Sequence, residues 1–276
     1  MPALRVTLCQ MAVAKSKETN LSKAVGMITA AAKRGANLAV LPECFTCPYG
    51  TKYFEAYSEE IGPGFPTYDA ISKVAKENNI WVIAGSIPER SGEKLYNSCI
   101  VFDATGKLNH VHRKVHLFRI NTETVRMDEE EVLSPGNVVV PVSMNEKLKF
   151  GIGICFDVRY PLLAWKYAHE GTSFLVYPGA FNMVTGPLHW ELLARARAVD
   201  NQQFVILCSP ARDLSADYVA WGHSMVVDPM GKVIADAGEH EGYIDAELDL
   251  DLIEEAREKI PIMDGTRHDI YALNWK

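Results

Sequence analysis

Cys155 is the residue of this chain whose surroundings best suit covalent chemistry. Phe150 to Ile154 alternates apolar residues with glycines, which predicts a short buried strand ending at the cysteine. Gly151 and Gly153 leave one face of that strand bare, so that another backbone or a substrate can come close. A thiol between a strand end and a helix start lies near unpaired N–H groups, which favour the thiolate and can hold an oxyanion. Cys155 is therefore a candidate nucleophile, and the alternative is a buried structural cysteine.

Glu43 is a second candidate site residue. It follows the apolar run Asn37 to Leu41 and Pro42, so it stands at the C-terminal end of a predicted buried strand. Ligand sites of α/β sheets gather at that end. Cys155 closes another strand in the same sense, so the two side chains can converge on one end of the sheet. The alternative is an exposed loop carboxylate.

Lys114 lies in the stretch His112 to Phe118, where a predicted hairpin strand gives way to a loop. A lysine beside a cysteine lowers the pKa of the thiol and stabilises a developing oxyanion. Arg113 and His116 compete with Lys114 for this role, and the alternative is a solvated basic cluster. The acidic run Asp128 to Glu131 usually indicates a wet surface, but one of its members can turn inward to pair with the lysine.

The sequence gives less support to a catalytic Cys/His pair or to a metal site. His189 and His223 are available for a Cys/His pair, but neither sits in a recognised local signature. The segment HWE that begins at His189 lacks the second histidine of a zinc helix, and Cys44 to Cys47 has C-x-x-C spacing without a second pair. We therefore expect no bound metal and no cofactor.

The elements that must position these residues alternate between strands and helices, which predicts an α/β fold. Asp157 is a candidate N-cap for the helix after Cys155. The predicted strands are Leu4 to Gln10, Asn37 to Leu41, Ile80 to Ser86, Leu95 to Asp103 and Leu108 to Arg113, and the predicted helices are Asn20 to Lys33, Thr67 to Asn78 and Tyr160 to Ala168.

Three segments of the second half echo segments of the first in the same order. GANLAVLP (35–42) matches GTSFLVYP (171–178), WVIAGS (81–86) matches FVILCS (204–209), and CIVFDATGK (99–107) matches SMVVDPMGK (224–232). This order predicts an internal duplication whose sheets stack into a four-layer α-β-β-α sandwich. We expect one domain over residues 1–250 and a C-terminal tail, 251–276, that packs on the domain or on a partner subunit.

Composition narrows the class of protein. The 276 residues are 48% hydrophobic and can bury a large core, which excludes a disordered chain. The net charge of -7 argues against nucleic-acid and anionic-membrane partners and favours a small molecule or a protein. Without a membrane-length apolar run or a signal-peptide core, we expect a cytoplasmic protein and leave a mitochondrial pool open. Six irregularly spaced cysteines fit reduced thiols.

These segments resemble the nitrilase superfamily of carbon–nitrogen hydrolases over about residues 4–249. The carriers are LAVLPECF around Glu43, HRKVHLF around Lys114 and GIGICFDVRYP around Cys155. Longer segments are similar to the omega-amidase branch: ECFTCPYGTKYF (43–54), KLYNSCIVF (94–102), YPGAFNMVTGPLHWELLARARAVDNQ (177–202) and YVAWGHSMVVDPMG (218–231).

The resemblance implies a role for each matching residue. Cys155 would be the nucleophile, Glu43 the general base and Lys114 the cation that stabilises the tetrahedral intermediate. The backbone N–H of Phe156 would complete the oxyanion site, and Arg159 stands where the family grips a substrate carboxylate.

A second glutamate of the family falls on Glu129, with Glu130 and Glu131 as adjoining alternatives. The matching segments also offer pocket walls and a dimer contact: Tyr49, Phe118, Phe181, Thr185 and the helix Trp190 to Val199.

The resemblance implies hydrolysis of the terminal amide of short dicarboxylic acid monoamides, above all alpha-ketoglutaramate and alpha-ketosuccinamate, through a cysteine thioester. It also implies a homodimer. Two alternatives stay open: an amidase of the same superfamily for a larger substrate, such as deaminated glutathione or a carbamoyl amide, and a non-catalytic scaffold. Intact Glu43, Lys114 and Cys155 weigh against the scaffold.

Overall fold

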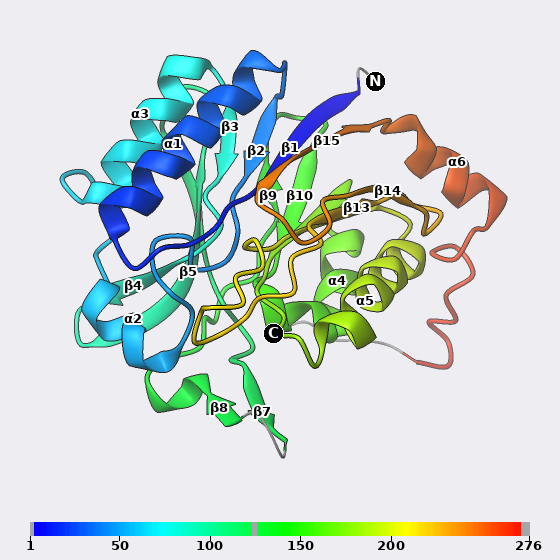
Figure 1. Ribbon diagram of the computed structural model, residues 1–276. Helices are drawn as coiled ribbons and strands as arrows, with labels where there is room; N and C mark the ends of the chain where they lie inside the picture. Colours follow the sequence, from blue (N-terminus) through cyan, green and yellow to red (C-terminus); the bar gives the residue numbers. More distant parts are fainter. Residues whose placement is uncertain (1–2, 123–125, 272–276) are drawn as a thin grey trace.

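The computed structural model describes residues 3–122 and 126–271, and two β-sheets lie at its centre (Figure 1). The first sheet contains β1 (Leu4–Gln10), β2 (Leu38–Val40), β3 (Trp81–Ile83), β4 (Ile87–Ser91), β5 (Lys94–Phe102), β6 (Leu108–Arg113) and β15 (Gly242–Leu248). The second contains β9 (Val142–Ser143), β10 (Lys149–Ile152), β11 (Phe174–Pro178), β12 (Phe204–Cys208), β13 (Met225–Val227) and β14 (Val233–Asp236). β7 (Arg119–Asn121) and β8 (Arg126–Asp128) pair separately.

Helices cover the outer faces of both sheets (Figure 1). α1 (Lys17–Lys33) and α3 (Pro66–Asn78) cover the first sheet, and α4 (Pro161–His169) and α5 (Gly186–Asn201) cover the second. α2 (Thr51–Tyr57) and α6 (Asp251–Lys259) lie at the margins of the molecule, and the 3-10 turns are η1 (Glu129–Glu131) and η2 (Cys155–Arg159). Among the described helices, none is both long and apolar enough to cross a membrane.

The same strand pattern occurs in both sheets. β1, β2 and β3 are parallel and β5 follows antiparallel, while β10, β11 and β12 are parallel and β13 follows antiparallel. The turns after β5 and β13 also match: Asp103 Oδ1 accepts the N–H groups two and four residues on, at 2.8 and 3.1 Å, and Asp228 Oδ1 does so at 2.9 and 3.0 Å. The predicted duplication is confirmed.

The sheets pack face to face, which confirms the four-layer sandwich. Val6 and Val40 of the first sheet share one buried core with Ile152 and Val176 of the second. Successive strand residues point to opposite faces, so Cys9 belongs instead to the core under α1 and α3. α4 and α5 cover the outer face of the second sheet.

Aromatic rings fill the bare face of β10. A Cβ on Gly151 would lie 2.5 Å from the ring of Tyr167, and one on Gly153 would lie 2.5 Å from the ring of Tyr177. The prediction that a backbone or a substrate approaches this face is therefore wrong, because α4 and β11 bring tyrosines to it.

The segment after Cys155 also differs from the prediction. α4 begins at Pro161 with Tyr160 as its N-cap residue. Asp157 lies earlier, inside η2, where its Oδ2 accepts the N–H of Ile154 at 2.8 Å. Asp157 is therefore not the N-cap of α4, because its short side chain folds back onto the turn that carries the cysteine.

The chain returns to the first sheet at its end. β15 pairs antiparallel with β1, and α6 follows it. Ile253 and Ala256 of α6 are buried, and Gln202 Nε2 donates to the carbonyls of Ala256 at 2.9 Å and Ile260 at 2.7 Å. This part of the predicted tail packs on the domain, while residues 272–276 lie outside the described residues.

Candidate active site

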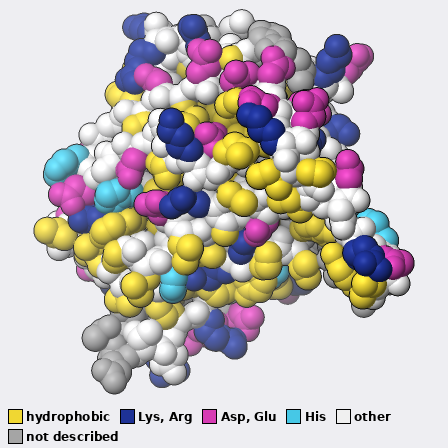
Figure 2. Space-filling model, turned by 90° about the vertical axis from the view of Figure 1, so that its right-hand side faces the viewer, with side chains coloured by type: hydrophobic (Ala, Val, Ile, Leu, Met, Phe, Trp, Pro, Cys, Tyr) yellow, Lys and Arg dark blue, Asp and Glu magenta, His cyan; other side chains and the backbone are white. Residues whose placement is uncertain are grey.

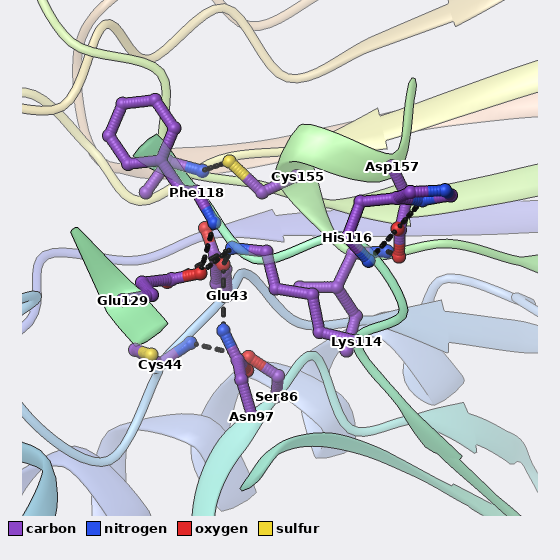
Figure 3. Close-up of polar contacts among 12 residues, drawn as sticks. Glu43, Cys44, Ser86, Asn97, Lys114, His116, Phe118, Glu129, Cys155 and Asp157 are labelled. Atoms are coloured by element: carbon purple, nitrogen blue, oxygen red, sulfur yellow. Dashed lines mark hydrogen bonds and ion pairs between the residues drawn. The ribbon is translucent and has the colours of Figure 1, made fainter. Parts of the chain in front are cut away.

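Four buried side chains meet where elements of the two halves end (Figure 3). Glu43 follows β2, Lys114 follows β6, Glu129 opens η1, and Cys155 opens η2 after β10. The first three are 0% exposed and Cys155 is 4% exposed. The structure therefore brings together the four residues that sequence reasoning selected, and water has little access to them.

Lys114 lies between two carboxylates. Its Nζ is 3.0 Å from Glu43 Oε1 and 2.9 Å from Glu129 Oε2. Burial acts to lower the pKa of the ammonium, but the charges of Glu129 and Glu43 outweigh it and hold the pKa of Lys114 well above its usual value. Lys114 is therefore a fixed cation at the centre of the cluster.

Glu129 has partners on both carboxylate oxygens. Tyr49 donates its hydroxyl to Oε1 at 2.7 Å, and the backbone N–H of Phe118 donates to Oε2 at 2.7 Å. Lys114 contacts both oxygens as well. Glu129 is therefore suited to orient the lysine and has no free oxygen for proton transfer.

Glu43 has partners on one oxygen only. Asn97 Nδ2 and Lys114 Nζ both donate to Oε1, at 2.9 and 3.0 Å. Oε2 is buried and has no hydrogen-bond partner among the described residues. Burial raises the pKa of Glu43, and the opposing charge of Lys114 only partly offsets this. Glu43 is therefore suited to take up a proton on Oε2.

Cys155 stands on a strained turn. Its φ of 47° lies in the left-handed region, which is unusual for a residue with a side chain. The backbone N–H of Ala180 points at the sulfur, with an N to Sγ distance of 3.4 Å. Such strain persists only when the surroundings fix the backbone, and here the Asp157 carboxylate does so from within η2.

The surroundings of Cys155 favour the protonated thiol. Burial is the main cause that raises the pKa of Cys155 well above its usual value, and the charge of Glu43 adds to it, while Lys114 and the Ala180 N–H act in the opposite direction. The prediction that the turn favours a thiolate is therefore wrong for the resting site, because the thiol is buried beside a carboxylate. A base must remove the proton when the sulfur reacts, and Glu43 is the neighbouring base.

Asp157 links the nucleophile turn to the lysine segment. Its Oδ1 accepts the N–H of His116 at 2.9 Å and lies 2.7 Å from His116 Nδ1. The His116 side chain is therefore bonded to Asp157 and does not contact the thiol. Arg113 is engaged too, because its Nε donates to Glu89 at 2.8 Å. Lys114 is therefore the residue of this stretch that enters the site.

The remaining alternatives lie elsewhere. Glu130 and Glu131 are exposed, and Glu130 pairs with Arg119, so Glu129 is the inward glutamate of the run. His223 pairs with an aspartate at 3.1 Å. Within the described part of the chain, no three His, Cys, Asp or Glu side chains are grouped to hold a metal ion.

Two adjoining cavities lie beside the cluster: the inner one touches Glu43, and the outer one touches none of the four side chains. The inner one, of about 50 Å³, is lined by Glu43, Tyr49, Ala180 and Tyr218 among others. The outer one, of about 480 Å³, shares Tyr49 and Tyr218 with it and also touches Asn182. Tyr49, predicted as a pocket wall, therefore lines both cavities.

Arg159 lies beside the nucleophile turn with its side chain half-buried. Its guanidinium covers the ring of Phe181, with 4.7 Å to the ring centre, and Nη1 lies 3.2 Å from His189 Nδ1. Within the described residues, no carboxylate forms an ion pair with it. Thr185, another predicted wall, bonds to Asn182 at 3.1 Å where α5 begins and has no part in either cavity.

A family model described as carbon-nitrogen hydrolase matches residues 5–258. The chain belongs to the carbon–nitrogen hydrolase family. It is 51% identical to omega-amidase NIT2 of Xenopus tropicalis over 277 residues, which cover 100% of this chain and 99% of that protein. It is 49% identical to omega-amidase NIT2 of Bos taurus, with the same two shares. The crystal structure of Nit3 of Saccharomyces cerevisiae, a member of branch 10 of the nitrilase superfamily, matches with a TM-score of 0.88 and 44% identity over 97% of both chains. The resemblance to the nitrilase superfamily is confirmed.

Sequence reasoning did not single out three contributors to this carbon–nitrogen hydrolase site. Asn97 donates to Glu43, Ala180 points its N–H at the thiol, and Tyr218 lines both cavities and donates its hydroxyl to the carbonyl of Ala180 at 2.6 Å. All three lie inside the longer segments that resemble the omega-amidase branch. Their place in those segments was the one signal that could have identified them, because none of the three residues ends a predicted strand.

Proposed function

We propose that this carbon–nitrogen hydrolase is an omega-amidase that releases ammonia from the terminal amide of short dicarboxylic acid monoamides, such as alpha-ketoglutaramate and alpha-ketosuccinamate. Relatives named omega-amidase, about 50% identical over the full chain, support this activity. The observation that carries the substrate class is the half-buried guanidinium of Arg159, which has no acidic partner among the described residues and lies in the segment that follows Cys155.

The first half of the reaction acylates the enzyme. Glu43 Oε2 takes the proton of the Cys155 thiol while the sulfur attacks the amide carbon. The developing oxyanion is stabilised by Lys114 and by the backbone N–H of Phe156. Protonated Glu43 then gives its proton to the amide nitrogen, the carbon–nitrogen bond breaks, and ammonia leaves a thioester on Cys155.

The second half restores the enzyme. Glu43, again ionised, takes a proton from a water molecule as the water oxygen attacks the thioester carbon. The carbon–sulfur bond breaks, the dicarboxylic acid leaves, and the proton on Glu43 returns to the sulfur. The raised pKa values of Cys155 and Glu43 both suit this cycle, because Glu43 passes the thiol proton to the leaving ammonia and later gives the sulfur a proton taken from water.

Arg159 gives the site a preference for substrates that carry a carboxylate at the end opposite the amide. A guanidinium binds a carboxylate through two parallel hydrogen bonds, and the Phe181 ring beneath it limits its movement. We expect wild-type protein to hydrolyse succinamate with a kcat/KM about 10- to 100-fold above that of butyramide, which carries a methyl group instead of the carboxylate.

The test is ammonia release by wild type, Arg159→Leu and the control Arg195→Leu, an arginine on α5 that pairs with Glu191 at 3.4 Å. Arg159→Leu should lower the rate with succinamate to that with butyramide, and the control should leave both rates unchanged. Equal rates with the two substrates in wild type, or an unchanged preference in Arg159→Leu, would refute this assignment. Faster turnover of a larger omega-amide than of succinamate would favour the alternative substrate class.

We also propose that the protein is a homodimer. Leu188 and Leu192 of α5 are 63% and 61% exposed, and Leu162 at the start of α4 is 52% exposed. Figure 2 views the side of the molecule that bears these helices and shows hydrophobic side chains gathered across it. Exposed apolar surface of this kind marks an interaction site. Leu188→Glu with Leu192→Glu should halve the mass seen by sedimentation, and an unchanged mass would refute the interface.

A further inference from the structure

Glu43 is held by more than the lysine. Asn97, near the middle of β5 and 1% exposed, donates from Nδ2 to Glu43 Oε1 at 2.9 Å. A carboxylate oxygen only accepts hydrogen bonds, so the amide must present its nitrogen here. The backbone carbonyl oxygen of Asn97 also accepts the backbone N–H of Lys114, at 2.8 Å. Asn97 therefore fixes the side chain of the base and the backbone of the cation at once (Figure 3).

The two donors at Oε1 make the oxygens of Glu43 unequal. Oε1 receives Asn97 and Lys114, whereas Oε2 is buried with no partner among the described residues. Asn97 Oδ1 is likewise buried and without a partner there. An apolar side chain would avoid that unsatisfied atom, so the amide at this position is better explained by the bond that Nδ2 makes to the base.

We propose that Asn97 is a positioning residue of the catalytic base, which holds Glu43 Oε1 so that Oε2 alone exchanges the proton with the thiol. This inference rests on the proposed function in one respect, namely that Glu43 acts as the base. Asn97 itself touches neither the thiol nor the reacting atoms. It acts by fixing the rotation of the carboxyl group and by favouring its ionised form, because a donated N–H stabilises a carboxylate.

The consequence is a shift in pH dependence with a defined sign. Glu43 must be ionised to take the thiol proton, so activity falls when the pH drops through its pKa. Loss of the Asn97 donor removes a bond to the ionised form and raises that pKa further. The acidic limb of kcat/KM must then move to higher pH, while KM for the substrate changes little.

The experiment compares Asn97→Leu with the matched control Asn201→Leu. Asn201 on α5 is also 1% exposed, donates one bond from Nδ2 to a backbone carbonyl at 2.9 Å, and has a buried Oδ1 without a partner among the described residues. Both variants should lose some stability. Only Asn97→Leu should lower kcat with succinamate, by about 10- to 100-fold, and move the acidic limb to higher pH.

A second measurement needs no substrate. The rate at which iodoacetamide alkylates Cys155, followed on its peptide by mass spectrometry, should rise with pH through the ionisation of Glu43. Its midpoint should be higher in Asn97→Leu than in wild type. If Asn97→Leu does not fold, Asn97→Ala, whose smaller side chain cannot clash with its neighbours, carries the same prediction. A folded variant with an unshifted limb and midpoint would overturn the proposal. A wild type that is inactive on omega-amides but still shows the midpoint shift would refute the substrate and uphold the positioning role.

Discussion

The two halves of this chain have one strand pattern and divide the active site between them. The first half provides Glu43, Lys114 and Glu129, all charged, and the second provides Cys155 and Arg159. β2 and β11 occupy corresponding places; β11 ends at Pro178, and Pro42 stands two residues beyond the end of β2. The residue after Pro42 is the base, Glu43, whereas the residue after Pro178 is Gly179.

The glycine gives the nucleophile its space. A Cβ on Gly179 would lie 3.2 Å from Cys155 Cα and 3.1 Å from the ring of Trp190. A side chain at the position that corresponds to Glu43 would therefore press on the strained turn. The comparison teaches that duplication supplied two similar strand ends, and that a functional site required them to become different.

The strongest test of this division removes the cation of the first half. Lys114→Met leaves Glu43 and Glu129 buried without their common partner, which costs about 3–5 kcal/mol of unfolding free energy. Hydrolysis should fall below detection. Urea unfolding and ammonia release measure the two effects, with Lys73→Met, an exposed lysine of α3 that pairs with Glu77 at 3.8 Å, as the control. A variant with wild-type stability would contradict the paired arrangement.

A sharper test compares the two carboxylates of the first half. Glu43→Gln should lower kcat about 10²- to 10⁴-fold, because it removes the general base. It should also remove from the pH profile of Cys155 alkylation the step that the ionisation of Glu43 produces. Glu129→Gln makes the same chemical change on the carboxylate whose oxygens are already engaged, so it should weaken activity yet keep that step. Loss of the step in Glu129→Gln alone would reverse the two roles.

A smaller effect is expected at the link between the halves. Asp157→Asn should reduce unfolding free energy by about 1.5–3 kcal/mol at neutral pH, because the carboxylate accepts charge-assisted bonds from both sides of the site. Although burial raises it, His112 and His116 hold the pKa of Asp157 below its usual range. Its contribution is therefore present above about pH 4 and is lost as the pH falls further.

The measurement for this link is urea unfolding of wild type and Asp157→Asn at several pH values. The difference between them should shrink below about pH 4. Asn145→Ala is the control, since that amide oxygen accepts two N–H groups of a turn, at 2.9 and 3.0 Å, and does not titrate. A difference that stays constant with pH would show that the Asp157 charge does not stabilise the fold.

The sequence predicted the site residues that end strands. Glu43 and Cys155 follow strands in the parallel part of each sheet, where ligand sites gather at the C-terminal ends, whereas Lys114 follows the antiparallel strand β6. Glu129 could be selected only from the family resemblance, because the sequence of the acidic run does not distinguish it from Glu130. Burial against Tyr49 and Phe118 makes that distinction in the fold.

Sequence reasoning missed or wrongly predicted features that depend on packing between distant segments. In the sequence, Asn97 is an ordinary residue of an alternating strand. Its contact with Glu43 could not be predicted, because the two residues are 54 positions apart. The thiolate prediction considered the turn alone, whereas burial and Glu43 raise the pKa of the thiol. The prediction that one face of β10 is open was wrong for the same reason, because Tyr177 fills that face from a neighbouring strand.

The division of chemistry between the halves is tested most directly by finding where the substrate acyl group is attached. Protein turning over succinamate is quenched in acid, digested and examined by mass spectrometry, with Cys155→Ala in parallel. We predict a succinyl group on the Cys155 peptide of the wild type, and neither adduct nor ammonia release in the variant. An acyl group on another residue, or wild-type ammonia release by Cys155→Ala, would contradict the account.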